Sequence, residues 1–101
     1  MSNNGKKNGS SGRILVREVR ILNKLGLHAR PAALFVKSAS RFVSDITIAK
    51  GGNEVSGKSI MGLMTIEAAM GSVLRITAEG PDAEDALAEL QKLIENKFFE
   101  D

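Results

Sequence analysis

The sequence lacks several residue types that build common functional sites: it has no Cys, no Trp and no Tyr, and one His in 101 residues. The absence of Cys excludes disulfide frameworks, thiolate zinc sites and cysteine nucleophiles, and we expect neither a metal nor a cofactor. No apolar run approaches the roughly 20 residues that span a bilayer, and no signal-peptide core follows Met1. These absences favour a cytoplasmic protein with no membrane insertion.

Charge is unevenly divided along the chain. The formal net charge is +2, but residues 1–13 contribute +3 through Lys6, Lys7 and Arg13, and the other 88 residues carry −1. Residues 2–12 contain only Asn, Gly, Ser and Lys, which cannot bury apolar area. We therefore expect a flexible leader at residues 1–13 and one folded domain at residues 14–101. Because the basic charge belongs to the leader, nucleic-acid binding by the domain is not expected.

Hydrophobic periodicity predicts four strands and three helices. Alternation of apolar and polar residues indicates strands at residues 14–22, 45–50, 54–58 and 72–79. Apolar residues at helical spacing indicate helices that begin near residues 29, 59 and 82, and the apolar stripe of the last helix reaches Phe98. Asp82, Glu84 and Asp85 are interpreted as helix-start charges alone. The order β-α-β-β-α-β-α indicates an α+β sandwich with the helices on one face of the sheet.

The single histidine lies where the first predicted helix begins. Within residues 26–32 (GLHARPA), Pro31 suits a first helical turn, which places His28 at or next to the N-cap. Free backbone N–H groups at a helix start bind anions, and Arg30 adds a forked donor suited to phosphate oxygens. This site is therefore suited to hold a phosphoryl group on a ring nitrogen. A histidine that merely caps the helix is the alternative.

Two segments resemble motifs of one known family. Residues 22–32 (LNKLGLHARPA) closely resemble the phosphohistidine signature of the HPr family, the histidine-containing phosphocarriers of the bacterial sugar phosphotransferase system. Residues 57–64 (GKSIMGLM) resemble the regulatory serine motif of that family. The resemblance covers the chain from Val16 to about Phe98. It implies an open-faced β-sandwich with a four-stranded antiparallel sheet.

The resemblance also implies roles for three residues. His28 would be phosphorylated on Nδ1, Arg30 would be its phosphate partner, and Ser59 would be modified by HPr kinase/phosphorylase. The chain would accept a phosphoryl group from phosphoenolpyruvate by way of enzyme I and pass it to EIIA-type sugar permease domains. It would act as a carrier and not as an independent enzyme. A transcriptional regulator is a further expected partner, and a monomer is the expected state.

One residue departs from the family pattern. Leu25 stands three residues before the histidine, where many members carry a short polar side chain, so no side-chain contribution to phosphate binding is expected there. Leu25 and the run NKLG resemble nitrogen-branch paralogues. Residues 58–62 (KSIMG) instead favour the sugar branch or a hybrid regulated by a serine kinase. A regulatory or nitrogen-branch paralogue without sugar transport therefore stays an alternative.

Apolar residues that follow Ser59 predict a docking surface. Ser59 is suited to cap a short helix in which Leu63 is expected to be buried. The other apolar residues of this helix would be exposed and would form an adaptable binding surface, as Met residues often do. The residues expected to bind the partner proteins, near the serine and near the histidine, are Ile60, Met61, Met64, Leu27 and Ala33.

A second phosphate motif competes with this interpretation. Residues 52–59 (GNEVSGKS), from Gly52 to Ser59, match the pattern of a nucleotide-binding phosphate loop. That loop needs a parallel-sheet strand before it and a full helix after it, whereas these residues alternate like a hairpin strand followed by a short helix. A nucleotide-binding protein that uses this segment is the alternative function from another class.

Overall fold

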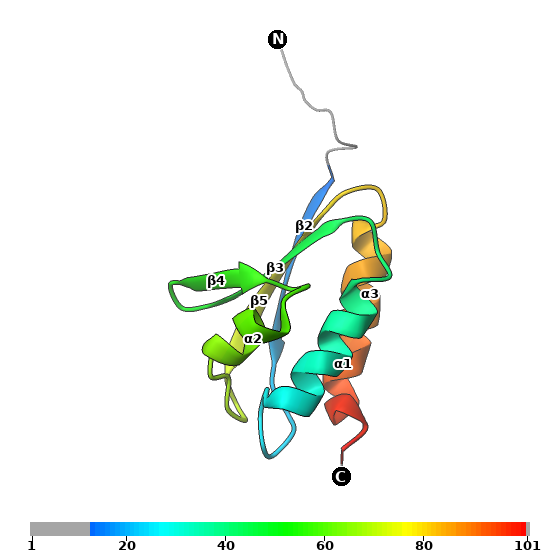
Figure 1. The fold of residues 1–101 in the computed structure, drawn as a ribbon. Helices are drawn as coiled ribbons and strands as arrows, with labels where there is room; N and C mark the ends of the chain where they lie inside the picture. Colours follow the sequence, from blue (N-terminus) through cyan, green and yellow to red (C-terminus); the bar gives the residue numbers. More distant parts are fainter. Residues whose placement is uncertain (1–12, 101) are drawn as a thin grey trace.

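The computed structural model describes residues 13–100, and the expected leader lies outside them except for Arg13. Its sheet contains the strands β2 (Ile14–Arg20), β3 (Asp45–Lys50), β4 (Asn53–Ser56) and β5 (Val73–Glu79). The spatial order is β2-β5-β3-β4, and every neighbouring pair is antiparallel (Figure 1). The predicted strands are confirmed: β3 has the predicted ends, and the ends of the other strands differ by at most two residues.

Three helices complete the α+β open-faced sandwich: α1 (Ala29–Ala39), α2 (Ile60–Thr65) and α3 (Ala83–Glu95) (Figure 1). Alternate strand residues face these helices, so on β5 Leu74, Ile76 and Ala78 are at most 1% exposed. They pack with the apolar stripes of α1 and α3 in one core. The predicted fold class is therefore confirmed. Within residues 13–100, none of the helices has the length and apolar character to cross a membrane.

The end of α3 differs from the predicted stripe. The α-helix ends at Glu95, and the 3-10 turn η1 (Lys97–Phe99) follows it. Phe98 is buried as predicted, but Lys97, Phe98 and Phe99 have φ of 55°, 55° and 62°. Left-handed backbone costs about 1–2 kcal/mol per non-glycine residue. The turn directs Glu100 back toward the loop that precedes α1.

Asp82 has a role beyond the predicted helix-start charge. Its carboxylate accepts hydrogen bonds from the backbone N–H groups of Val43 and Ser44, at 2.9 Å each, and from the Ser44 hydroxyl. The Ser44 hydroxyl bond, followed by the Val43 bond, lowers the pKa of the Asp82 carboxyl below its ordinary value of 3.8. The prediction of a helix-start charge alone is therefore wrong, because Asp82 also ties the start of α3 to the loop before β3.

Candidate functional site

His28 is the N-cap residue of α1, as predicted. Its carbonyl oxygen accepts the N–H of Ala32 at 2.9 Å, while its side chain makes no capping hydrogen bond to the first turn. The alternative in which the imidazole caps the helix is therefore wrong. The N–H groups of Ala29 and Arg30 precede the first intrahelical donor, and Pro31 has none. The helix start thus presents two backbone donors beside an imidazole, with no acidic residue in the first turn.

The loop before His28 is fixed by a close backbone contact. Gly26 has φ of 71°, and a Cβ atom there would collide with the carbonyl oxygen of Ala68. The next residue, Leu27, donates its N–H to the same oxygen at 2.8 Å and is 5% exposed. Leu27 is therefore a core residue that anchors the loop. Its predicted place in an exposed docking surface is wrong, because the contact with Ala68 directs it inward.

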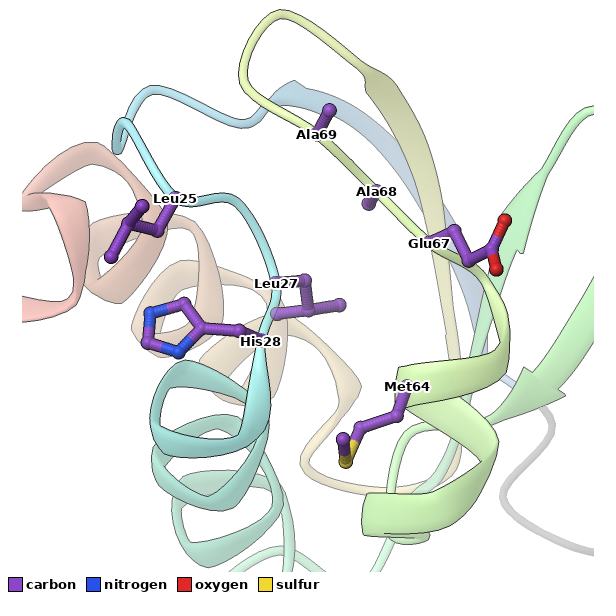
Figure 2. A pocket seen from close by; sticks show the side chains of 7 residues that line it. All are labelled: Leu25, Leu27, His28, Met64, Glu67, Ala68 and Ala69. Atoms are coloured by element: carbon purple, nitrogen blue, oxygen red, sulfur yellow. The ribbon is translucent and has the colours of Figure 1, made fainter.

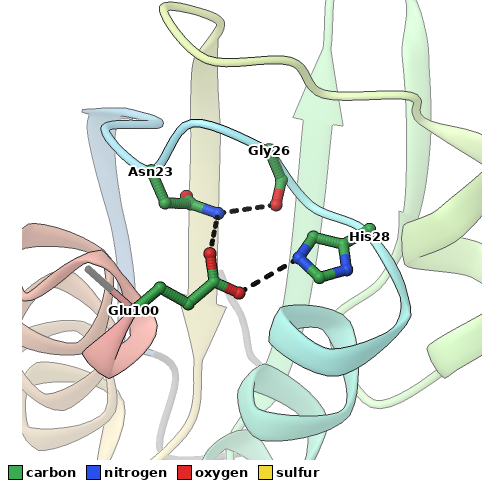
Figure 3. A network of polar contacts seen from close by, with 4 residues as sticks. All are labelled: Asn23, Gly26, His28 and Glu100. Atoms are coloured by element: carbon green, nitrogen blue, oxygen red, sulfur yellow. Dashed lines mark hydrogen bonds and ion pairs between the residues drawn. The ribbon is translucent and has the colours of Figure 1, made fainter.

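A polar network connects the histidine to the C-terminal end of the described chain (Figure 3). Nε2 of His28 lies 3.0 Å from Oε2 of Glu100. Oε1 of Glu100 accepts a hydrogen bond from Nδ2 of Asn23 at 3.2 Å, and the same amide donates to the carbonyl oxygen of Gly26 at 2.7 Å. Asn23 was predicted only as part of the segment that resembles the phosphohistidine signature, without a role of its own, and Glu100 was not predicted to belong to the site.

Two shallow depressions meet at the imidazole. One contains Lys24, Arg30, Phe99 and Glu100 with His28, so the structure brings the predicted phosphate partner to the same hollow as the histidine. The other extends from His28 to Met64 of α2, and its lining is completed by Leu25, Leu27, Glu67, Ala68 and Ala69 (Figure 2). The imidazole is 38% exposed, so a partner can reach it.

The short helix α2 has the predicted N-cap residue before it, and its apolar residues are buried or exposed as predicted. Oγ of Ser59 accepts the N–H of Gly62 at 3.0 Å, which confirms the predicted N-cap. Leu63 is fully buried, whereas Ile60, Met61 and Met64 are 41%, 79% and 44% exposed. Ala33 is also exposed on α1, which packs against α2.

The segment from Gly52 to Ser59 does not form a phosphate loop. It begins in a hairpin turn and continues as β4, which pairs with β3 in an antiparallel sheet. The N–H of Gly57 donates to the carbonyl oxygen of Ile46 at 2.7 Å, and Nζ of Lys58 donates to the carbonyl oxygen of Phe42 at 2.8 Å. Both donors would face the nucleotide in a phosphate loop, so the nucleotide-binding alternative is wrong.

Known proteins resemble this chain in sequence and in structure. The family described as "PTS HPr component phosphorylation site" matches residues 15–96. Phosphocarrier protein HPr of Treponema pallidum is 48% identical over 87% of this chain and 100% of its own length. The HPr-like protein Crh of Bacillus subtilis is 42% identical over 80% of this chain and 95% of its own length. The crystal structure of HPr-C-His from Thermoanaerobacter tengcongensis superposes with a TM-score of 0.83 and 48% identity, covering 86% of this chain and 98% of the other.

The family match extends over most of the domain and includes both His28 and Ser59. The antiparallel sheet with helices on one face agrees with the solved HPr structures. The chain therefore belongs to the HPr family, whose members carry phosphoryl groups in the phosphotransferase system and are not independent catalysts.

Proposed function

We propose that the chain accepts a phosphoryl group on Nδ1 of His28 from phospho-enzyme I and passes it to EIIA-type domains of sugar permeases. The observation that carries the proposal is the start of α1. An accessible imidazole stands beside two backbone N–H donors and Arg30, where no side chain of the first turn supplies a negative charge. Such a helix start favours a bound anion.

The transfer exchanges one phosphorus–nitrogen bond for another. The Nδ1 lone pair of His28 attacks the phosphorus of the donor phosphohistidine, the bond to the donor nitrogen breaks, and its electron pair returns to the donor ring. Arg30 and the N–H groups of Ala29 and Arg30 would then surround the phosphoryl oxygens. A surface hollow without deep walls suits this role, because the partner protein supplies the other half of the reaction site.

The docking surface proposed for the partners consists of Ile60, Met61, Met64 and Ala33. All four are exposed, and Met64 borders the same depression as His28. Enzyme I and an EIIA-type domain must each bring a histidine to His28, so one shared surface is expected. A transcriptional regulator is a further proposed partner of this surface. We also propose a cytoplasmic monomer with its domain at residues 14–101.

Ser59 is proposed as a regulatory site for HPr kinase/phosphorylase. Ser59 is half-buried at the start of α2, directly before the predicted docking residues Ile60 and Met61. A phosphate there would interact favourably with the helix start and add nearly two negative charges beside Ile60 and Met61. The expected result is weaker docking with an unchanged fold.

The Crh relatives support a second candidate function. HPr-like proteins named Crh from Halalkalibacterium halodurans and Bacillus subtilis are 46% and 42% identical over 80% of this chain. A mainly regulatory or nitrogen-branch carrier would use the same fold without serving sugar transport. The absence of permease genes near the coding gene would favour this second function.

The test follows the phosphoryl group through two steps. The full chain is incubated with enzyme I and phosphoenolpyruvate, its intact mass is measured, and the isolated product is mixed with an EIIA-type domain. We expect one acid-labile phosphoryl group on the chain and its loss to the second protein. Phosphorylation without transfer to any sugar-specific domain would favour the regulatory role, and no phosphorylation at all would contradict both.

A further inference from the structure

Glu100 contacts the ring nitrogen of His28 that the proposed reaction does not use. We propose that Glu100 is a positioning residue for phosphoryl transfer: its carboxylate accepts the Nε2–H of His28 and holds the imidazole in the tautomer that leaves the Nδ1 lone pair free. The inference rests on the proposed function, because this tautomer helps transfer only if Nδ1 is the acceptor.

The contact determines where the imidazole proton lies. Oε2 of Glu100 is 3.0 Å from Nε2 of His28 (Figure 3). A neutral imidazole has one N–H donor and one acceptor nitrogen, and an ionised carboxylate only accepts hydrogen bonds. Nε2 must therefore carry the proton when this bond forms. Figure 3 shows Nδ1 on the side of the ring away from Glu100, where its lone pair is free to react.

Asn23 holds the other oxygen of the carboxylate. Its Nδ2 donates to Oε1 of Glu100 at 3.2 Å and to the carbonyl oxygen of Gly26 at 2.7 Å. Because both neighbours are acceptors, the amide must present its nitrogen to them. Asn23 is 1% exposed, so packing leaves the amide little freedom to rotate. Asn23 thus orients the carboxylate and also fixes the loop two residues before His28.

The backbone after α3 adopts a strained conformation that brings Glu100 to this position. Lys97, Phe98 and Phe99 are all left-handed, and such backbone persists in non-glycine residues only where the surroundings hold it. Phe98 is 1% exposed and anchors the turn in the core. A continued α-helix would carry the chain onward along its axis. The turn instead returns the carboxylate to the imidazole, where it is 19% exposed.

The carboxylate also matches the charge that develops during transfer. As the Nδ1 lone pair bonds to phosphorus, Nε2 keeps its proton, so the ring of His28 becomes cationic while the donor ring regains its electron pair. A carboxylate that is hydrogen-bonded to a ring N–H stabilises an imidazolium, as the Asp does in a Ser-His-Asp triad. Glu100 acts through the imidazole and not on the phosphorus.

Two substitutions separate the charge of Glu100 from its hydrogen bond. Glu100→Ala removes both, whereas Glu100→Gln removes the charge and leaves one oxygen to accept from either the Nε2–H of His28 or the Nδ2–H of Asn23, with an NH2 group facing the other. Glu89→Gln is the matched control, because it removes an exposed carboxylate that pairs with Arg41 at 2.9 Å. The ¹⁵N chemical shifts of the imidazole report the tautomer in each unphosphorylated full-length protein. The rate of phosphorylation by phospho-enzyme I reports transfer, with kcat and KM measured separately.

We expect the Nε2–H tautomer to predominate in the wild-type protein. Glu100→Ala should populate both tautomers and lower kcat about tenfold, the size expected when a hydrogen bond to a charged group is lost. KM should stay unchanged because the docking residues are intact. Glu100→Gln should weaken the preference for the Nε2–H tautomer less than Glu100→Ala does and give an intermediate kcat, and Glu89→Gln should match wild type.

Several results would overturn the inference. An unchanged tautomer population in Glu100→Ala, an unchanged kcat in that variant, or an equal loss in Glu89→Gln would each do so. These results are distinguishable from a failure of the proposed function, in which wild-type protein itself gains no phosphoryl group on His28. In that case the inference fails with it, whatever tautomer the spectra show.

Discussion

The starts of helices α1 and α3 are built in opposite ways. Helix α3 has Glu84 and Asp85 in its first turn, and Asp82 before it accepts hydrogen bonds from the backbone of the loop before β3. Helix α1 has no acidic residue in its first turn, and its N-cap His28 leaves the first donors without a side-chain acceptor. Acidic side chains at a helix start typically stabilise it by about 0.3–1 kcal/mol.

The difference shows which helix start is available to a ligand. At α3 the favourable charge interaction is already made by the chain itself, so the helix start contributes to stability. At α1 no residue of the first turn makes that interaction, so an external anion can make it, and the phosphoryl group on His28 would provide one. Stability and the proposed function are therefore located at different helix starts, and substitutions should affect one without the other.

Among substitutions at the helix starts that leave His28 in place, Ser59→Asp should produce the largest change in transfer, because it places a permanent negative charge in the proposed docking surface. Partner binding must remove water from this charge beside Ile60 and Met61, so phosphorylation of His28 by enzyme I should fall at least about tenfold. Thermal stability should hardly change, since Asp is as good an N-cap as Ser. Steady-state kinetics and thermal unfolding check the two parts.

Ser59→Asn is the matched control, since it keeps the shape and the capping ability of Asp without the charge. It should be phosphorylated on His28 at nearly the wild-type rate. Ser59→Ala should also keep transfer and lose about 1 kcal/mol of folding free energy with the cap. Equal rates for Ser59→Asp and wild type would leave Ser59 with a capping role only.

Ala29→Asp would make the start of α1 resemble that of α3. Ala29 is exposed in the first turn, so the new carboxylate should stabilise the helix by about 0.3–1 kcal/mol. It should also repel the phosphoryl group and slow phosphorylation of His28 about fivefold. Denaturant unfolding and initial rates measure these opposite effects. Ala29→Asn provides the uncharged comparison, and a loss of rate equal to that of Ala29→Asp would rule out the charge as its cause.

Asp82→Asn should have the smallest functional effect, because it alters the helix start that serves stability. The pKa of Asp82 is lowered in the folded protein, so folding favours the ionised carboxyl. Its contribution is present above the ordinary value of 3.8 and is lost as pH falls through the lower folded value. Asp82→Asn should therefore unfold at a lower temperature than wild type at neutral pH, and this difference should shrink in strong acid.

Asp85→Asn is the control for this experiment, since Asp85 is exposed in the same first turn. Its loss of stability should be smaller than that of Asp82→Asn. Both variants should be phosphorylated on His28 at the wild-type rate. A constant difference between Asp82→Asn and wild type from neutral to strongly acidic pH would contradict the role given to the hydrogen bonds from Ser44 and Val43.

Local patterns predicted most of the fold. Alternation located the strands, and the division of α2 into buried Leu63 and exposed Met61 followed from spacing around Ser59. Phe98 was predicted to be buried because it lies four residues after Ile94, and this was correct although the α-helix ends earlier. Burial follows from apolar character, whereas the left-handed turn depends on packing that periodicity does not describe.

The site was predicted only in part, because several of its contacts join distant parts of the chain. His28 and Arg30 are close in sequence, so a helix-start argument located both. Glu100 lies 72 residues after His28, and nothing in its own neighbourhood marks it as a site residue. Asp82 likewise reaches a loop 38 and 39 residues away. Such contacts follow from the tertiary fold.

The central claim is that the start of α1, whose first turn has no acidic residue, holds the phosphoryl group on His28. Its most direct test is the intact mass of wild type and His28→Ala after incubation with enzyme I and phosphoenolpyruvate, with thermal unfolding of both. We predict one acid-labile phosphoryl group on wild type and none on His28→Ala, with similar unfolding temperatures because the side chain is outside the core. Normal phosphorylation of a folded His28→Ala protein would contradict the account.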